Sequence, residues 1–244
     1  QGVSSAASDV YKRQQRDTSG HGTLLASISA GSYTDGYVGV APGAELLVVK
    51  LKQSKQYLRD FFLIKDDVPA FEESDIMLAL RFLEDYAIRL GKPLIIIFGL
   101  GSANGSRTGA SPLAEMMENL TKKPNISVIT CMGNEANNKC HYKGTVMSAL
   151  VPDVMEINVD GTGKGFTMEI WADSLAILSV SIESPSGEYV PRIPARMGAS
   201  MEYTFLYEGS TVTVDYQITE NVAGMEVIFV RLKTPVEGTW KFYI

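Results

Sequence analysis

The sequence is poor in cysteine, lacks long apolar runs and carries no excess of positive charge. Its two cysteines, Cys131 and Cys140, make no disulfide framework and lack metal-site spacing, so neither a disulfide scaffold nor a metal is expected. The longest apolar runs, such as Leu94–Phe98, are far shorter than a membrane span. The net charge of -6 argues against nucleic acid as a partner, because nucleic acid attracts basic surfaces.

The first 15 residues are polar and aperiodic, without the apolar segment of a signal peptide. The stretch from Val3 to Gln14 resembles a translated sequencing adapter. We therefore interpret residues 1–15 as a non-native leader. The missing signal peptide then says nothing about secretion, and the residues leave localisation open.

Residues 16–150 alternate strand and helix signals. Apolar runs at 45–51, 94–98 and 126–131 predict strands of the buried kind found in parallel sheets. Helical spacing runs from Ser74, a plausible N-cap, to Gly91, and a second helix is predicted from Pro112 to Lys123. Strands alternating with helices predict βαβ units and a parallel sheet.

After residue 150, apolar residues no longer recur at helical spacing. Short alternating or β-branched runs, separated by Gly and Pro turn signals, follow at 154–159, 166–171, 176–182, 202–206, 211–217, 225–230 and 240–244. Seven short strands at such spacing predict an antiparallel sandwich over residues 151–244.

His21 lies in the most informative stretch, Asp17-Thr-Ser-Gly-His21-Gly-Thr23, which small residues follow up to Gly31. Glycines on both sides of a histidine allow neighbouring backbone to come very near, and the pattern places His21 at the start of a buried helix. A histidine that acts as a general base needs a fixed ring, with one nitrogen facing a nucleophile and the other an orienting carboxylate. His21 is therefore a candidate general base.

This stretch is similar to the histidine motif of the subtilases, the subtilisin-like serine proteases of peptidase family S8. Gly39-Val-Ala-Pro-Gly-Ala44 likewise resembles the family's Gly-Val-Ala-Pro-x-Ala segment. The resemblance implies that His21 is the general base. Asp17 lies inside the histidine motif and is interpreted as structural, while Leu24 and Leu25 stand where the family often has histidine and valine.

The segment after the run at 94–98 resembles the family's substrate strand. Gly99-Leu100-Gly101 matches the place of a Ser-x-Gly edge strand that pairs with the substrate backbone, with glycine in place of the serine. Main-chain pairing survives that exchange. The resemblance therefore implies that Gly99, Leu100 and Gly101 bind substrate.

A further segment, Cys131-Met-Gly133-Asn134-Glu135, resembles the family's oxyanion segment. There an asparagine amide donates a hydrogen bond to the tetrahedral oxyanion, where negative charge develops. The resemblance implies this catalytic role for Asn134. The alternative is a turn asparagine, which is common after strands.

Gly198-Ala-Ser200-Met201 mimics the family's nucleophile motif. The residues that follow predict a strand where the family has a helix, so we interpret Ser200 as a sandwich residue. The arrangement is similar to that of the clostridial Csp-like germination proteases, in which a jelly-roll domain is inserted between the oxyanion and serine segments. It implies a fragment that lacks the catalytic aspartate and serine.

The predicted fold class is α/β: a partial subtilisin-like, doubly wound parallel sheet in residues 16–150, then an inserted antiparallel, jelly-roll-like β-sandwich. The implied function is a serine endopeptidase with a polypeptide substrate, no cofactor and a possible prodomain outside this chain. The resemblance also implies a secreted or spore-associated bacterial protein. The alternative is a catalytically dead pseudoprotease that binds or signals. The sandwich either rigidifies the protease domain or binds glycan or protein.

Overall fold

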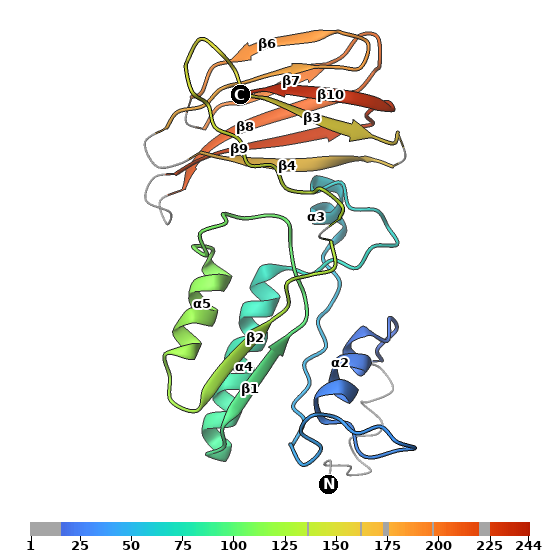
Figure 1. The fold of residues 1–244 in the computed structure, drawn as a ribbon, viewed down its shortest axis with the longest axis vertical. Coiled ribbons are helices and arrows are strands. Elements are labelled where there is room, and N and C mark those ends of the chain that lie inside the picture. Colours follow the sequence, from blue (N-terminus) through green and yellow to red (C-terminus); the bar gives the residue numbers. More distant parts are fainter. Residues whose placement is uncertain (1–15, 136, 162, 173–175, 197, 220–224) are drawn as a thin grey trace. The chain divides into compact units, whose positions relative to one another are not determined.

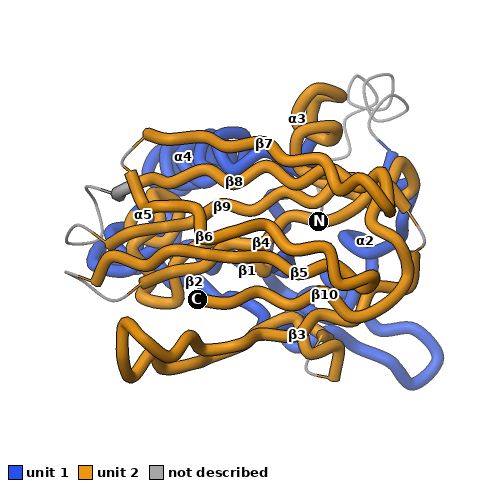
Figure 2. Tube along the Cα trace, turned by 90° about the horizontal axis from the view of Figure 1, so that it is seen from above, with its two compact units in different colours: residues 1–52, 71–101, 116–133 blue, residues 53–70, 102–115, 134–244 orange. Residues whose placement is uncertain are grey.

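The computed structural model describes residues 16–135, 137–161, 163–172, 176–196, 198–219 and 225–244. These residues form two compact units that interleave along the chain (Figure 2). Unit 1 takes residues 1–52, 71–101 and 116–133, and unit 2 takes 53–70, 102–115 and 134–244. Two excursions of the N-terminal half therefore belong to the unit that contains the sandwich. The domain boundary at residues 150 and 151 stays a prediction, as does the leader, which lies outside the described residues.

Unit 1 contains a two-stranded parallel sheet with helices before each strand (Figure 1). The elements are α2 (His21–Ala30), α4 (Glu73–Leu90), β1 (Leu94–Phe98), α5 (Pro112–Thr121, which both units share) and β2 (Ile126–Thr130). Leu94 pairs with Ile126 and Phe98 with Thr130, so both strands end at the same edge of the sheet. The parallel β/α arrangement predicted for this half is confirmed, and the bounds of β1 match the apolar run.

The strand predicted at residues 45–51 is wrong. Within the described part of the chain, this segment belongs to none of the three sheets, and Leu46 and Val48 are 56% and 72% exposed. A strand needs a neighbouring backbone to receive its hydrogen bonds, and apolar character alone does not supply one. The N-cap prediction also fails, because α4 begins at Glu73, with Glu72 as its N-cap residue.

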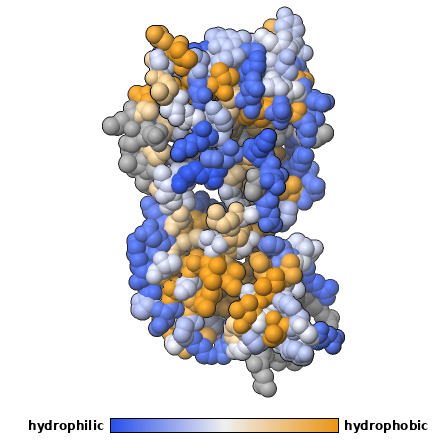
Figure 3. Space-filling model, viewed as in Figure 1, coloured by the Kyte–Doolittle hydropathy of each residue, from blue (hydrophilic) through white to orange (hydrophobic). Residues whose placement is uncertain are grey.

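One face of the two-stranded sheet is apolar and exposed. Ile95, Ile97 and Ile129 are 64%, 46% and 53% exposed, whereas Ile96, on the opposite face, is buried. On the side drawn in Figure 3, hydrophobic residues gather over part of unit 1. The prediction that these apolar runs are buried is therefore confirmed for one face only, since the isoleucines of the other face are about half exposed.

Unit 2 is a sandwich of two four-stranded antiparallel sheets, together with helix α3 (Gln56–Phe61) and the first turn of α5. The strands are β3 (Val154–Val159), β4 (Gly165–Trp171), β5 (Val180–Glu183), β6 (Tyr189–Ile193), β7 (Ser200–Thr204), β8 (Thr211–Thr219), β9 (Met225–Lys233) and β10 (Gly238–Tyr243). Their orders are β3-β10-β5-β6 and β4-β9-β8-β7. The antiparallel sandwich is confirmed. Strand β6 was not predicted from the sequence; it contains Pro191, and a strand at the edge of a sheet tolerates proline.

The core of unit 2 lies between these two sheets. Trp240 and Phe205 are buried and meet edge to face, with ring centroids 5.0 Å apart. The buried hydroxyl of Tyr216 donates to the carbonyl of Ile193 at 2.7 Å and accepts from the backbone N–H of Val180 at 3.3 Å. This tyrosine therefore joins β8 of one sheet to β5 and β6 of the other. Ser200 is the first residue of β7, as the strand interpretation predicts.

Candidate active site

The position of His21 is set by the start of helix α2. Gly20 precedes it with a φ of 77°, a left-handed conformation that glycine adopts without strain. A Cβ at Gly20 would meet nothing within 4 Å, so this glycine serves the turn and not a close approach. The predicted helix start is confirmed. The predicted burial is wrong for the described structure, because Ala30 is the buried residue of α2 while Leu24 and Ile28 are 59% and 47% exposed.

Asp17 holds the first turn of α2. Its Oδ1 accepts the backbone N–H of Gly20 at 2.9 Å, and its Oδ2 accepts both the backbone N–H and the hydroxyl of Thr23, at 2.8 and 2.9 Å. The backbone hydrogen bond from Thr23 is the largest of several causes that hold the pKa of Asp17 well below its usual range. Because this pKa is lowered on folding, the stabilisation is present at neutral pH and is lost only as the pH falls through the lowered value. Asp17 therefore acts as a capping residue, which supports its structural interpretation.

The other end of α2 is held by backbone hydrogen bonds from residues 39–41. The N–H groups of Gly39, Val40 and Ala41 donate to the carbonyls of Gly31, Ile28 and Ser29 at 2.8 to 3.0 Å. These carbonyls have no partner inside the helix, so the segment satisfies them from outside. A Cβ at Gly39 would lie 2.4 Å from the backbone N of Gly31, which explains why glycine begins this motif. The Gly-Val-Ala-Pro segment thus fixes the helix that carries His21.

The imidazole of His21 contacts the segment predicted to bind substrate. Its Nε2 lies 2.9 Å from the carbonyl oxygen of Gly99. A carbonyl oxygen only accepts hydrogen bonds, so in this arrangement Nε2 carries the proton and donates it. Two site residues that are 78 positions apart in the sequence therefore meet in unit 1.

Gly99 leaves room for Leu25, a relation that sequence analysis missed. A Cβ at position 99 would lie 2.2 Å from Cδ1 of Leu25, but 3.5 Å from Cγ of Leu25 and from Nε2 of His21. Two of the three departures from the family pattern, Gly99 and Leu25, are thus spatially complementary. A leucine longer than the usual valine fills the space that a side chain at position 99 would need.

Replacing Gly99 by serine is therefore expected to destabilise the chain by about 1 kcal/mol, through overpacking against Leu25. Since Cδ1 is the end of a flexible side chain, the cost stays near the lower limit for overpacked sites. Adding Leu25→Val removes the clashing atom, so the double variant should recover stability relative to the sum of the single changes, with a coupling of about 0.5–1 kcal/mol. Urea unfolding of the four proteins measures this coupling.

Gly101→Ser is the matched control, because a Cβ at Gly101 would meet nothing within 4 Å. It should change stability by less than about 0.5 kcal/mol, as exposed substitutions do. Additive effects of Gly99→Ser and Leu25→Val would contradict the matched-pair explanation.

The remaining predicted site residues leave the sheet at one edge. Gly99, Leu100 and Gly101 continue β1, and Cys131 continues the neighbouring β2. Gly133, with a φ of 80°, then turns the chain immediately before Asn134, which is exposed. Asn134 belongs to unit 2 and His21 to unit 1. Their approach to one another, and the roles of all five site residues, stay predictions.

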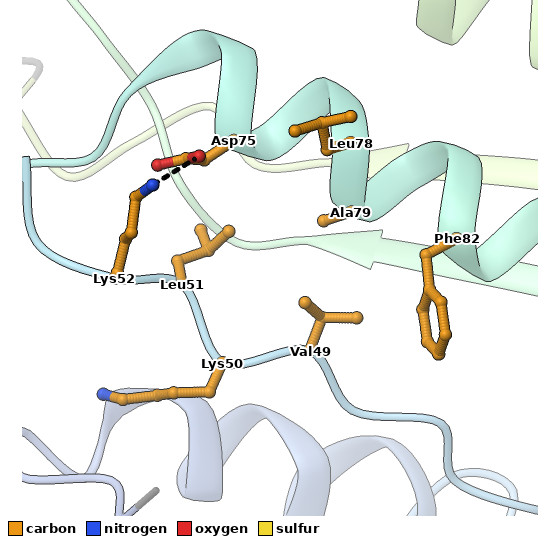
Figure 4. Close-up of a pocket in the computed structure, with 8 residues that line it drawn as sticks. All are labelled: Val49, Lys50, Leu51, Lys52, Asp75, Leu78, Ala79 and Phe82. Carbon is orange, nitrogen blue, oxygen red and sulfur yellow. Dashed lines mark ion pairs between the residues drawn. The ribbon is translucent and has the colours of Figure 1, made fainter.

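An open pocket of about 300 Å³ lies elsewhere in unit 1, between residues 49–52 and helix α4 (Figure 4). Its walls are largely apolar, with Leu78 and Phe82 on the helix side, and an ion pair joins Lys52 to Asp75 at 3.0 Å. The hydrogen bond to Asp75 raises the pKa of Lys52. None of the predicted site residues lines this pocket, so it is separate from the candidate active site.

The described residues contain no cluster of three or more His, Cys, Asp or Glu side chains that could hold a metal ion. Cys131 and Cys140 are exposed free thiols. Nor does any helix in the described ranges combine the length and apolar character needed to cross a membrane.

Comparisons with known proteins agree with the sequence resemblance. A sequence model of the subtilase family, Peptidase_S8, matches residues 3–181, which include most of the proposed leader. Among solved structures, the CspB protease of Clostridium perfringens is similar, with a TM-score of 0.70 at 22% sequence identity, over 95% of this chain and 50% of that one. No curated protein matches the chain.

These similarities differ in what they establish. The match to CspB protease shows a shared fold, namely an α/β part followed by a β-sandwich, and this chain spans half the length of that one. The family match covers well over half of the present sequence and includes the histidine, Gly-Val-Ala-Pro and Gly-Asn-Glu segments. The chain therefore belongs to the subtilase family.

Proposed function

We propose that this chain forms part of a subtilisin-type serine endopeptidase, in which His21 is the general base and Asn134 the oxyanion donor. In this proposal, a serine and an aspartate outside residues 1–244 complete the catalytic triad. The substrate is an extended polypeptide that pairs with Gly99, Leu100 and Gly101 by main-chain hydrogen bonds. No cofactor takes part.

The contact between His21 and Gly99 is the observation that carries this proposal. Acyl transfer requires the general base beside the scissile bond, and a strand that binds substrate places that bond along itself. In the structure, Nε2 of His21 lies 2.9 Å from the backbone of the proposed substrate segment. The Asp17 cap and the Gly39–Ala41 segment anchor the helix that carries the ring.

Catalysis also requires a change of hydrogen-bond partner at His21. A triad histidine carries its proton on Nδ1 and presents an unprotonated Nε2 to the serine hydroxyl. In the structure Nε2 donates to Gly99 instead, so this bond must be released before the ring can accept a proton. A substrate N–H pairing with the Gly99 carbonyl would take over the acceptor, thereby coupling substrate binding to the release of Nε2.

Once released, His21 takes the proton of the attacking hydroxyl and later returns it to the leaving amine. Between these steps, negative charge develops on the scissile carbonyl oxygen. An amide N–H of Asn134 would stabilise that charge more than it stabilises the ground state. The parallel pairing of β1 with β2 supports this assignment, because both site segments leave the sheet at the same edge.

Fluorophosphonate labelling tests the proposal, since such probes react with activated serines. The 244-residue chain should remain unlabelled, whereas the complete polypeptide that contains it should be labelled at a single serine outside residues 1–244. Mass spectrometry of the labelled peptide identifies the site.

Specific labelling of Ser200, which begins strand β7, would overturn the assignment of the nucleophile. A complete polypeptide that neither reacts nor cleaves unstructured protein would favour the alternative, a pseudoprotease that binds or signals.

A further inference from the structure

The outer face of the sheet β4-β9-β8-β7 carries segments from the N-terminal half of the sequence. Phe61 of α3 stacks on Phe229 of β9, with ring centroids 5.6 Å apart and an interplanar angle of 4°. The guanidinium carbon of Arg231 lies over the Phe61 ring, 4.9 Å from the ring centroid. The excursion 53–70 is thus held to the sandwich by aromatic and cation–π contacts within unit 2.

A second segment, residues 102–115, is held on the same face by a carboxylate. Oε2 of Glu169, on β4, accepts the backbone N–H of Gly105 at 2.7 Å. The same oxygen accepts the indole N–H of Trp171 at 2.9 Å. Both contacts are partly buried, and hydrogen bonds to a carboxylate are stronger than those between neutral groups.

The local geometry fits an anchor. Glu169 and Trp171 lie two positions apart on one strand, so their side chains project from the same face, and the indole N–H restricts the carboxylate. Gly105 has a φ of 96°, which residues with a side chain rarely adopt. Glycine there lets the backbone present its N–H to the carboxylate without strain.

This anchored loop is the direct continuation of the substrate segment. Four residue steps separate Gly101 from Gly105, which a fully extended chain spans in about 14 Å. Fixing Gly105 therefore limits where the end of the Gly99–Gly101 segment can move. Loops gain precision when a rigid element holds them, and β4 pairs with β9 along its whole length.

We propose that Glu169 is a positioning residue: it anchors the loop after Gly101 to the sandwich and thereby holds the substrate-binding segment in register. The inference rests on the proposed function for its catalytic consequence, but the anchor itself is a property of this chain. On this proposal, the sandwich contributes to substrate recognition through the side chain of Glu169.

Three variants test the anchor in the 244-residue chain. Glu169→Ala removes both hydrogen bonds, whereas Glu169→Gln keeps an acceptor oxygen of similar reach. Glu188→Ala is the matched control, because Glu188 is also a carboxylate that anchors backbone, accepting the N–H groups of Leu206 and Tyr207 at 3.0 and 3.1 Å. Leu206 and Tyr207 are about 100 positions away from Gly99–Gly101 in the sequence, so loss of this contact should not affect the substrate segment.

Hydrogen exchange of residues 99–109 is the first measurement. Glu169→Ala should accelerate exchange at Gly105 and its neighbours by about 10- to 100-fold, as loss of a charge-assisted hydrogen bond implies. Glu169→Gln should retain most of the protection, and Glu188→Ala should leave this segment unchanged. Equal exchange in Glu169→Ala and the unsubstituted chain would overturn the anchor.

Kinetics of the complete polypeptide form the second measurement. Glu169→Ala should raise KM for peptide substrates about fivefold with little change in kcat, because it loosens binding equally in the ground and transition states. Fluorophosphonate labelling should remain complete. Unchanged KM in an active Glu169→Ala enzyme would overturn the positioning role while leaving the protease function intact. A complete polypeptide without activity would refute the protease function, and the exchange measurement would still decide the anchor.

Discussion

Replacing His21 by alanine in the complete polypeptide is expected to lower kcat for peptide hydrolysis by about a millionfold. The size is that measured for loss of the histidine in subtilisin, itself a member of this family, and is carried over on the strength of the family relation. The physical reason is that no other group takes the proton from the attacking hydroxyl or returns it to the leaving amine. Peptide hydrolysis at known protein concentration, with folding of the variant checked by circular dichroism, measures the loss.

His141→Ala is the natural control, because His21 and His141 are the two histidines of the sequence and His141 lies exposed in a loop. It should leave kcat and KM unchanged. His21→Ala should also abolish fluorophosphonate labelling, which depends on an activated serine. A loss of activity below tenfold would show that His21 is not the general base and would favour a structural role at the start of α2.

Replacing Asn134 by alanine should lower kcat by about 10²–10³ and leave KM nearly unchanged. This range is also known from the oxyanion asparagine of subtilisin. The amide acts where charge develops, so its loss affects the transition state and not substrate binding. Steady-state kinetics on an extended peptide substrate separate the two constants.

Two further variants sharpen this test. Asn134→Asp keeps the shape but replaces the donor with a negative charge, so it should be at least as inactive as Asn134→Ala at neutral pH. Asn137→Ala, a substitution at another exposed asparagine three positions further along the chain, should have no effect. A rise in KM at constant kcat for Asn134→Ala would assign the side chain to substrate binding instead.

Much of the fold could be predicted because local pattern and tertiary environment agree. The runs at 94–98 and 154–159 became β1 and β3 with unchanged bounds, since each found a pairing partner along its full length. The run at 45–51 is also rich in apolar residues, but among the described residues no strand pairs with it, so it did not become a strand. Pro191 concealed β6, because a proline argues against a strand until the position is known to be an edge.

In the candidate site, too, some features follow from local sequence and others only from tertiary contacts. The motif around His21 predicted a helix start, and the structure supplies its cause in the cap made by Asp17. The glycines beside His21 suggested close approach, but the tight contacts occur at Gly39 and Gly99. Such contacts depend on segments distant in sequence, which no local pattern records.

By itself, the sequence determined the family, the division into a β/α half and an antiparallel sandwich, and the identity of the candidate catalytic groups. These features follow from hydrophobic periodicity, turn residues and short motifs, all of which act within a few neighbouring residues. Only the tertiary structure decided that Leu25 matches Gly99, that His21 donates to the Gly99 carbonyl, and that Glu169 holds the loop after Gly101. These relations are contacts between residues tens of positions apart, and they exist only once the sheets have brought those residues together.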